Sequence, residues 1–372
     1  MQKHSSLLCR YLVQAGIKVD VYHPHVGKGE EVLYSQLGIT VVDRVNFFGI
    51  SFTSIPSFPG HYFWESFQYA KQISVECLER IRNTDLVYAQ GFTAWTYIEI
   101  RKKDPSLPPV MVNFHGLEMY QATFGIKQKL IQQSFKLFVK RNLMGADYVH
   151  SLGGELTDIL LNMGIAESKI FSLPIGIPQA WLDDEVHKPL DVRRFVFVGR
   201  YERRKGTEEL TKVLKELLKT ETFHFDFIGN IPKENQIKNS QIHYWGLIKE
   251  EETIQRILSE SDVLVCPSFA EGMPTVILEG MARGCAIIAT DVGAVCEVVN
   301  HEIGWLIEKG DSFLLKSTIQ KAIKLDENTL HRMQKMAHQK VTEKFIWEKV
   351  IQKMITGFLD ILTVPSSPVE KI

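Results

Sequence analysis

Two glutamates in the C-terminal half have a spacing that could serve chemistry. Glu271 and Glu279 are separated by seven residues, the first in a predicted loop and the second on a predicted helix. The short run 262–266 predicts a buried strand before the loop, and Pro274 predicts the first helical turn. The carboxyl ends of parallel strands bind ligands in open α/β sheets, and a helix N-terminus favours an anion such as a diphosphate. A carboxylate on each side of a diphosphate site would suit a nucleotide sugar, which has hydroxyls on both its ribose and its hexose.

A cluster of cations precedes another predicted helix. Arg200, Arg203, Arg204 and Lys205 lie between a predicted strand at 195–198 and a helix that we expect Thr207 to cap. Four cations at the carboxyl edge of a sheet strand are costly to gather unless an anion binds there. Arginine and lysine both suit phosphate oxygens. The alternative is a solvated basic turn.

The segment EGMPTVILEGMARGCAIIATDVGAVCEVV, residues 271–299, resembles the donor-site signature of the retaining glycosyltransferases of family 4. The resemblance implies the GT-B fold, an α/β architecture in which two Rossmann-like, doubly wound domains face each other across a cleft. It also implies a C-terminal helix that crosses back to the first domain. Without the flanking pattern, the two glutamates could be solvated charges of a loop and a helix.

The resemblance assigns roles to individual residues. Arg200 and Lys205 would bind the donor diphosphate, Glu279 the ribose, and Glu271 the transferred sugar. We expect the residues at the reacting centre to be His115, Glu271, Arg200 and Lys205. We expect the donor to be bound by Arg200, Lys205, Gly246, Leu247, Gly272, Met273, Thr275, Val276 and Glu279.

His115 comes from the other half of the chain. The run PVMVNFHG predicts a strand that delivers His115 and Gly116 to a loop at its carboxyl end. A strand ending in His-Gly and followed by Glu118 resembles the first domain of the family, where the matching histidine approaches the donor hexose. The alternative is a loop histidine without a chemical role.

The chain divides into three parts by this interpretation. We expect an acceptor-side domain at 1–177, a donor domain at 178–345, and a returning helix with a frayed tail at 346–372. Proline and charges mark a linker at 172–193. The chain opens on a helix, MQKHSSLLCRYLVQAG, where family members have a strand and a Gly-Gly turn. We therefore expect Met1 to be an internal methionine of a longer protein, the alternative being a truncated first domain.

Composition limits the remaining possibilities. The chain has 372 residues, 45% hydrophobic and 23% charged, as in globular proteins of two domains. A formal net charge of -1 argues against nucleic-acid binding. The five cysteines show no C-x-x-C spacing, which favours a reduced, cytoplasmic protein over a disulfide scaffold or a zinc site.

The segment 124–142 predicts a basic amphipathic helix. Such a helix can lie on an anionic membrane surface, which would place the protein at the inner face of the plasma membrane. It can equally be a core helix with a solvated basic face. The sequence alone favours the second interpretation over the first.

The predicted function is transfer of a sugar, with retention of configuration, from a nucleotide-diphosphate sugar to a glycan or lipid-linked acceptor. The family-level context is the synthesis of cell-surface polysaccharide or glycolipid. We expect no cofactor and no metal, because cations stand where a metal would otherwise neutralise the diphosphate. The alternatives are a non-catalytic partner subunit that binds nucleotide sugar, and a nucleotide-sugar epimerase of the same fold.

Overall fold

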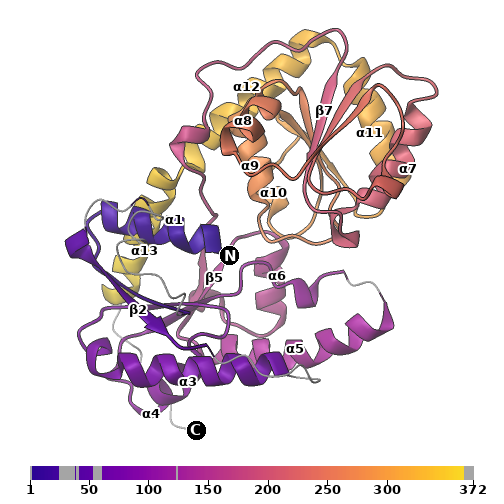
Figure 1. Ribbon diagram of the computed structural model, residues 1–372. Helices are drawn as coiled ribbons and strands as arrows, with labels where there is room; N and C mark the ends of the chain where they lie inside the picture. Colours follow the sequence, from indigo (N-terminus) through magenta and orange to yellow (C-terminus); the bar gives the residue numbers. More distant parts are fainter. Residues whose placement is uncertain (1, 25–37, 39–41, 53–60, 123–124, 364–372) are drawn as a thin grey trace.

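The computed structural model describes residues 2–24, 38, 42–52, 61–122 and 125–363. The predicted frayed tail therefore lies almost entirely outside the described residues. Within them the chain forms two α/β domains joined by the segment near residue 177 (Figure 1). The two-domain α/β architecture predicted from the sequence is confirmed.

The second domain is built on one parallel sheet of six strands in the order β12-β11-β10-β7-β8-β9. Strands β10 and β11 are buried at every residue, as expected of central strands covered by helices on both faces. This is why their sequences are continuous apolar runs. The elements of this domain are η4 (Gln179–Trp181), β7 (Arg194–Val198), η5 (Arg203–Lys205), α7 (Thr207–Leu217), β8 (His224–Ile228), η6 (Lys233–Asn235), β9 (Ile242–Gly246), α8 (Glu251–Ser259), β10 (Val263–Cys266), α9 (Thr275–Ala282), β11 (Ala286–Thr290), α10 (Val295–Val298), β12 (Gly304–Ile307), α11 (Ser312–Lys324) and α12 (Glu327–Lys344).

The first domain carries two parallel sheets, β1-β2 and β3-β4-β5-β6. Among the described residues no strand joins the two sheets. Strands β1 and β3 are only partly buried, whereas β4 is buried throughout. The elements of this domain are α1 (Gln2–Gln14), β1 (Val19–Pro24), η1 (Val42–Arg44), β2 (Val45–Ile50), α3 (His61–Ile81), β3 (Val87–Gln90), α4 (Trp95–Lys103), β4 (Val110–Asn113), η2 (Glu118–Tyr120), α5 (Ile126–Gly145), β5 (Tyr148–Ser151), α6 (Glu155–Asn162), η3 (Glu167–Lys169) and β6 (Ile170–Ser172).

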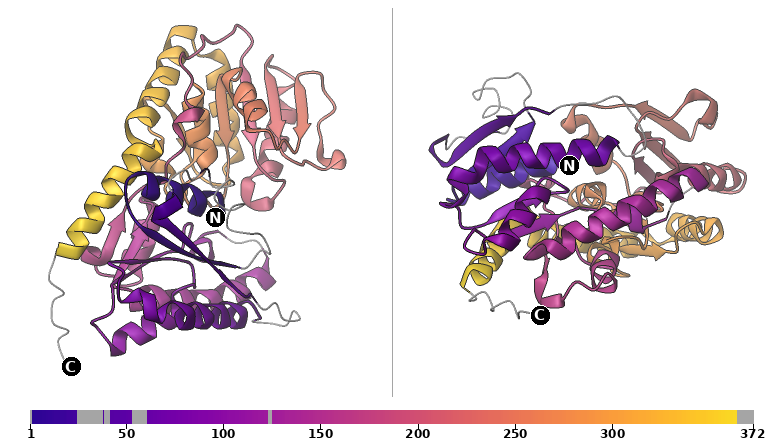
Figure 2. Two further views of the ribbon diagram at one scale, coloured as in Figure 1. Left: turned by 60° about the vertical axis from the view of Figure 1, so that its left-hand side comes forward. Right: turned by 90° about the horizontal axis from the view of Figure 1, so that it is seen from below.

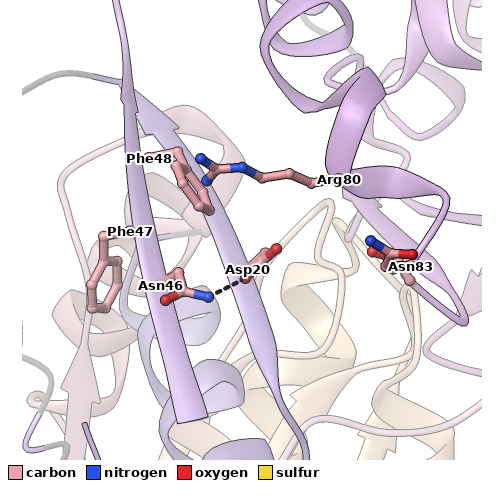
Figure 3. Close-up of a pocket in the computed structure, with 7 residues that line it drawn as sticks. Asp20, Asn46, Phe47, Phe48, Arg80 and Asn83 are labelled. Atoms are coloured by element: carbon pink, nitrogen blue, oxygen red, sulfur yellow. Dashed lines mark hydrogen bonds between the residues drawn. The ribbon is translucent and has the colours of Figure 1, made fainter. Parts of the chain in front are cut away.

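A shallow pocket lies at the amino ends of β1 and β2, beside the C-terminal end of α3 (Figure 3). Asn46 donates a hydrogen bond to Asp20 at 2.7 Å, and the Arg80 guanidinium lies 4.4 Å from the centre of the Phe48 ring. The pocket is at the opposite end of these strands from their carboxyl ends, where parallel sheets bind ligands. Its lining residues are Asp20, Asn46, Phe47, Phe48, Arg80, Asn83 and Thr84.

The C-terminal helix α13 (Trp347–Thr363) returns to the first domain (Figures 1 and 2). Its apolar face, which includes Trp347 and Met354, packs on α1 and buries Leu8 and Leu12. The rings of Tyr11 and Trp347 stack with centroids 5.7 Å apart. The predicted crossing of this helix is confirmed, and the apolar stripe that predicted it is the face that packs.

The start of helix α3 meets the middle of α5 at the end of the first domain that is farther from the second domain (Figure 1). The Phe63 ring of α3 lies 4.3 Å from the Phe138 ring of α5. None of the helices within the described ranges is long and apolar enough to cross a membrane.

Candidate active site

Glu271 lies in the loop after β10, at the carboxyl edge of the second sheet, and is only 5% exposed. Its Oε1 accepts from Lys205 Nζ at 2.6 Å and from Ser268 Oγ at 2.6 Å. Arg204 Nη1 lies 3.5 Å from its Oε2. A buried carboxylate requires such compensation, because an unpaired charge out of water is costly. Glu271 and Lys205, which were predicted separately as site residues, are therefore in direct contact.

The four cations after β7 have different orientations. Lys205 and Arg204 face the Glu271 loop. Arg203 turns to α7, where it pairs with Glu209 and lies 4.6 Å from the Phe269 ring centre. Arg200 is largely exposed, with Nη1 3.0 Å from Glu202 Oε1. Two of the four, Lys205 and Arg204, thus point toward the site, and no individual role had been predicted for Arg204.

A glycine sets the close packing of this basic loop. Gly206 has φ +69, and a Cβ there would lie 2.0 Å from the carbonyl oxygen of Pro267. It occupies the N-cap position of α7, so the expected cap at Thr207 is wrong by one residue. Because the loop begins the helix through a glycine, its backbone can approach the β10 loop and bring Lys205 to Glu271.

Helix α9 carries Glu279 and presents its N-terminus at the same edge of the sheet. Burial raises the pKa of Glu279 from its usual 4.5 to about 7, and the charge of Lys3 from α1 acts in the opposite direction. Among the other predicted donor residues here, Met273 is buried, Gly272 and Val276 are partly buried and Thr275 is exposed. The first backbone N–H groups of α9 have no partner within the helix, so they can bind an anion.

His115 faces this edge from the first domain. Its φ of +57 is a strained conformation for a histidine, held by a 2.6 Å hydrogen bond from its own N–H to Asn113 Oδ1. Its Nε2–H donates to Gln90 Oε1. Burial lowers the pKa of His115 to about 4, so the ring is neutral at pH 7. The His4 ring of α1 lies edge-on to it at 4.8 Å, a neighbour that the sequence did not indicate.

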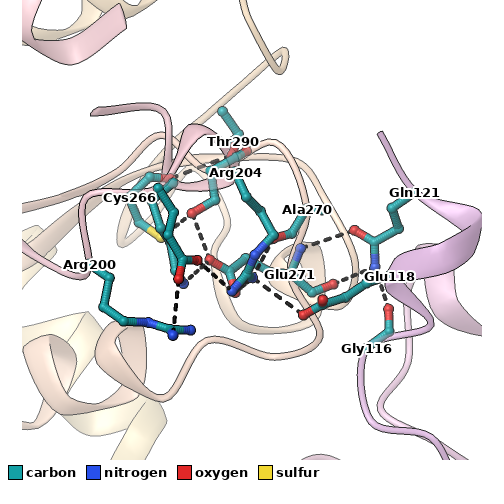
Figure 4. A network of polar contacts seen from close by, with 12 residues as sticks. Gly116, Glu118, Gln121, Arg200, Arg204, Cys266, Ala270, Glu271 and Thr290 are labelled. Atoms are coloured by element: carbon teal, nitrogen blue, oxygen red, sulfur yellow. Dashed lines mark hydrogen bonds and ion pairs between the residues drawn. The ribbon is translucent and has the colours of Figure 1, made fainter. Parts of the chain in front are cut away.

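The two domains touch at this point. A Cβ on Gly272 would lie 3.1 Å from the Cα of Gly116, so two glycines allow the backbones to meet. Glu118 of η2 reaches Arg204 at 3.4 Å across the boundary. Gln121 bonds to the backbone of Glu271 (Figure 4). His115 is therefore on the same small interface as Glu271.

The predicted base contacts Gly246 and Leu247 are not part of this cluster. Gly246 ends β9, and its carbonyl accepts from Gly229 N at 2.8 Å, which places it at the same edge of the sheet. Leu247 is 72% exposed. Within the described part of the chain, no side-chain hydrogen bond or ion pair links either residue to Glu271, Lys205 or His115.

Comparisons with known proteins agree with this geometry. Residues 1–181 match the family described as Glycosyltransferase Family 4, and residues 181–340 match Glycosyl transferases group 1. The chain belongs to glycosyltransferase family 4. The two matches meet at residue 181, so together they cover both domains.

Curated relatives of this family 4 chain include enzymes of polysaccharide synthesis. A teichuronic acid biosynthesis glycosyltransferase of Bacillus subtilis, TuaC, described as putative in its name, is 27% identical over 57% of this chain and 54% of its own length. The capsular polysaccharide biosynthesis glycosyltransferase CapM of Staphylococcus aureus is 30% identical over 48% of this chain and 50% of its own length. The chain thus matches about half the length of these relatives. An Escherichia coli UDP-Gal:alpha-D-GlcNAc-diphosphoundecaprenol alpha-1,3-galactosyltransferase is 24% identical over 78% of this chain and 79% of its own length.

Solved structures show the same fold. A glycosyltransferase from Rickettsia africae superposes with a TM-score of 0.73 at 19% identity, covering 98% of this chain and 95% of its own. Anabaena HepE in complex with UDP and glucose superposes with a TM-score of 0.67 at 16% identity, covering 96% of each chain. These likenesses confirm the GT-B architecture of the family 4 chain.

Proposed function

We propose that this protein is a retaining glycosyltransferase that moves a sugar from a nucleotide-diphosphate sugar to a glycan or lipid-linked acceptor. The observation that carries the proposal is the buried ion pair of Glu271 with Lys205, in a loop that meets the His115–Gly116 loop of the other domain at Gly272. The names of the relatives TuaC and CapM support a place in the synthesis of cell-surface polysaccharide. We also propose the boundaries 1–177, 178–345 and 346–372, supported by the bridge between Ile177 and Ile346.

Each side chain has a role in this proposal. Lys205 and Arg200 neutralise the leaving diphosphate, helped by the N–H groups at Thr275 and Val276 of α9. Glu279 accepts hydrogen bonds from the ribose and Glu271 from the transferred sugar. The other donor contacts are backbone atoms of Gly272 and Met273 beside the diphosphate, and Gly246 and Leu247 beside the base.

The reaction exchanges one bond at the anomeric carbon for another. The acceptor oxygen attacks the face from which the diphosphate leaves, so the carbon keeps its configuration. The bond to the diphosphate oxygen breaks as the bond to the acceptor oxygen forms, and the acceptor proton passes to the departing phosphate oxygen. The neutral His115 contacts the sugar from the first domain without adding charge near the developing positive centre.

Nucleotide binding tests the donor site, and its pH dependence tests Glu279. We expect one nucleotide from a panel of nucleoside diphosphates and nucleotide sugars to raise the thermal stability, by about 2.7 kcal/mol at 100 times its Kd. Only the ionised Glu279 carboxylate can accept hydrogen bonds from both ribose hydroxyls. Because its pKa is about 7 in the free protein, affinity should be full above pH 8 and fall up to about tenfold per pH unit below 7.

Glu279→Gln is the control for that pH dependence. This variant should bind the nucleotide more weakly at pH 8. Its affinity should also no longer change with pH near 7, since only titration of the nucleotide itself remains. Glu279 has a raised folded pKa, so its contribution to stability decreases as pH rises from about 4.5 to 7, and the variant should also lose that slope. Absence of any nucleotide shift at pH 8 would contradict the proposal. Binding without transfer to any acceptor would favour the partner subunit, and turnover without acceptor would favour the epimerase.

The outer face of α3 and α5 supports a further part of this proposal, peripheral contact with an anionic membrane at its cytoplasmic side. Leu130, Leu137 and Met144 recur every seven residues along α5 and are 69%, 73% and 51% exposed. Lys140 and Arg141 flank this line and are also exposed. The opposite face of α5 is buried in the core. The helix is therefore a core helix with a second, solvent-facing apolar line, which combines the two sequence interpretations.

An aromatic residue of α3 extends this surface. Tyr62 is 49% exposed and contacts Phe135 of α5 with ring centroids 5.4 Å apart. Tyrosine favours the interface between water and lipid, and lysine and arginine favour anionic headgroups. The combination is complementary to an anionic bilayer.

Vesicle sedimentation tests the membrane contact. We expect the protein to bind vesicles that contain phosphatidylglycerol, to bind pure phosphatidylcholine weakly, and to dissociate as salt is added. Leu130→Gln with Leu137→Gln should weaken binding at least tenfold, because about 1.4 kcal/mol of apolar burial is lost. Phe313→Ser is the matched control, since Phe313 is 82% exposed on α11 of the other domain. Equal effects of the two changes would overturn the assignment.

A further inference from the structure

We propose that Gln121 is a positioning residue that fixes the Glu271 loop through the contact between the domains. Its Nε2 donates to the Glu271 carbonyl oxygen at 2.6 Å, and its Oε1 accepts from the Glu271 N–H at 3.0 Å. One side chain of the first domain therefore bonds both the backbone N–H and the backbone C=O of a residue 150 positions away in the sequence. The inference rests on the proposed role of Glu271 in binding the donor sugar.

The chemistry of the site requires an amide side chain. Gln121 is 8% exposed, and its Nε2 also donates to the carbonyl of Gly116. A carboxylate could accept from the Glu271 N–H but would place a charge against two carbonyl oxygens. Alanine would leave the buried N–H and C=O of Glu271 without these bonds, and an unsatisfied buried polar group costs about 1–3 kcal/mol.

Fixing the backbone of Glu271 also fixes its carboxylate. With N–H and C=O held, the side chain leaves the loop in one direction, toward Lys205 and Ser268. Glu118 makes a second crossing to Arg204, which itself lies 3.5 Å from Glu271. The segment 116–121 thus contacts the loop from the backbone side while the cations contact it from the side-chain side (Figure 4). The contact between the two domains and the placement of Glu271 are therefore coupled.

Hydrogen exchange tests the positioning without a ligand. In Gln121→Ala the amide of Glu271 should exchange at least tenfold faster than in the unaltered protein. The control is Gln334→Ala: Gln334 is fully buried and bonds the Asp262 carbonyl at 3.3 Å within the second domain. This control should lower thermal stability but leave exchange at Glu271 unchanged. Unchanged exchange at Glu271 in Gln121→Ala would overturn the proposal.

Binding of UDP and UDP-galactose tests the consequence for the donor, the pair being chosen from the name of the Escherichia coli relative. Gln121→Ala should change the affinity for UDP by less than twofold and lower the affinity for UDP-galactose at least tenfold. The kcat of sugar transfer should also fall. A general structural defect would weaken both ligands equally, and that result would overturn the link to the sugar. If the unaltered protein bound neither ligand nor any other nucleotide sugar, the proposed function would fail while the exchange result still decided the positioning.

Discussion

Replacement of Lys205 with alanine is expected to lower the rate of sugar transfer by roughly 100- to 1,000-fold at saturating donor, the usual effect of removing one preorganised group that stabilises transition-state charge. The diphosphate gains charge as the glycosidic bond breaks. Lys205 is held by the buried Glu271 carboxylate, 2.6 Å away, so its charge needs no reorganisation at that moment. Single-turnover kinetics with saturating nucleotide sugar measure the effect on chemistry.

The same change should also affect stability, and a double variant separates the two effects. Lys205→Ala removes one partner of Glu271 and leaves Ser268 and the more distant Arg204. We therefore expect the free energy of unfolding to fall by about 2 kcal/mol, which is typical of a hydrogen bond to a buried charge. Lys205→Ala with Glu271→Gln removes the uncompensated charge and should recover much of that stability. Transfer should not recover.

A lysine on the next helix provides the control. Lys212 is exposed on α7, and Lys212→Ala should change neither transfer nor stability. If Lys205→Ala kept kcat within threefold of the unaltered protein, Lys205 would have only a structural role. If the double variant regained transfer along with stability, the loss in the single variant would reflect the unpaired glutamate rather than the missing cation.

The second domain could be predicted from the sequence because its local signals and its tertiary structure agree. The apolar runs that predicted strands, such as residues 286–290 of β11, are the central strands that helices cover on both faces. In the first domain β1 and β3 are partly exposed, so their sequences are less uniformly apolar. The aromatic segment between residues 32 and 60 could not be placed from the sequence, and most of it lies outside the described residues.

Sequence motifs predicted only part of the site. Glu271 and Lys205 are in contact, and both were found from residue types beside strand ends. Gln121 and Arg204 could not be assigned in this way, because their roles depend on how the two domains meet. A buried glutamine has no distinctive spacing, and Arg204 stood among cations that the sequence alone could not tell apart. His4 reaches His115 only because α1 packs at the domain boundary.

The turn at Gly293 joins the Glu271 loop to the first domain. Ala294 N donates to the Gly272 carbonyl at 2.8 Å, and Gly293 N donates to Glu155 Oε2 at 2.9 Å. Glu155 N in turn donates to the Gly293 carbonyl at 2.9 Å. Gly293 has φ +59, and a Cβ there would lie 2.2 Å from the Glu271 carbonyl oxygen. No flexible side chain can relieve that contact, so the backbone of one of the two loops must move.

Gly293→Ala should therefore lower transfer on the order of 100-fold, the expected cost of displacing a catalytic group by about 1 Å. Gly91→Ala is the matched control, because Gly91 also has φ +59 but a Cβ there would meet nothing within 4 Å. Both variants bear the strain of a left-handed alanine, about 1–2 kcal/mol, so both should lose similar stability from that source. Only Gly293→Ala should also lose transfer and exchange the Glu271 amide faster. Similar kcat values for the two variants would mean that backbone strain, rather than the close approach of Gly293 to Glu271, explains the need for glycine.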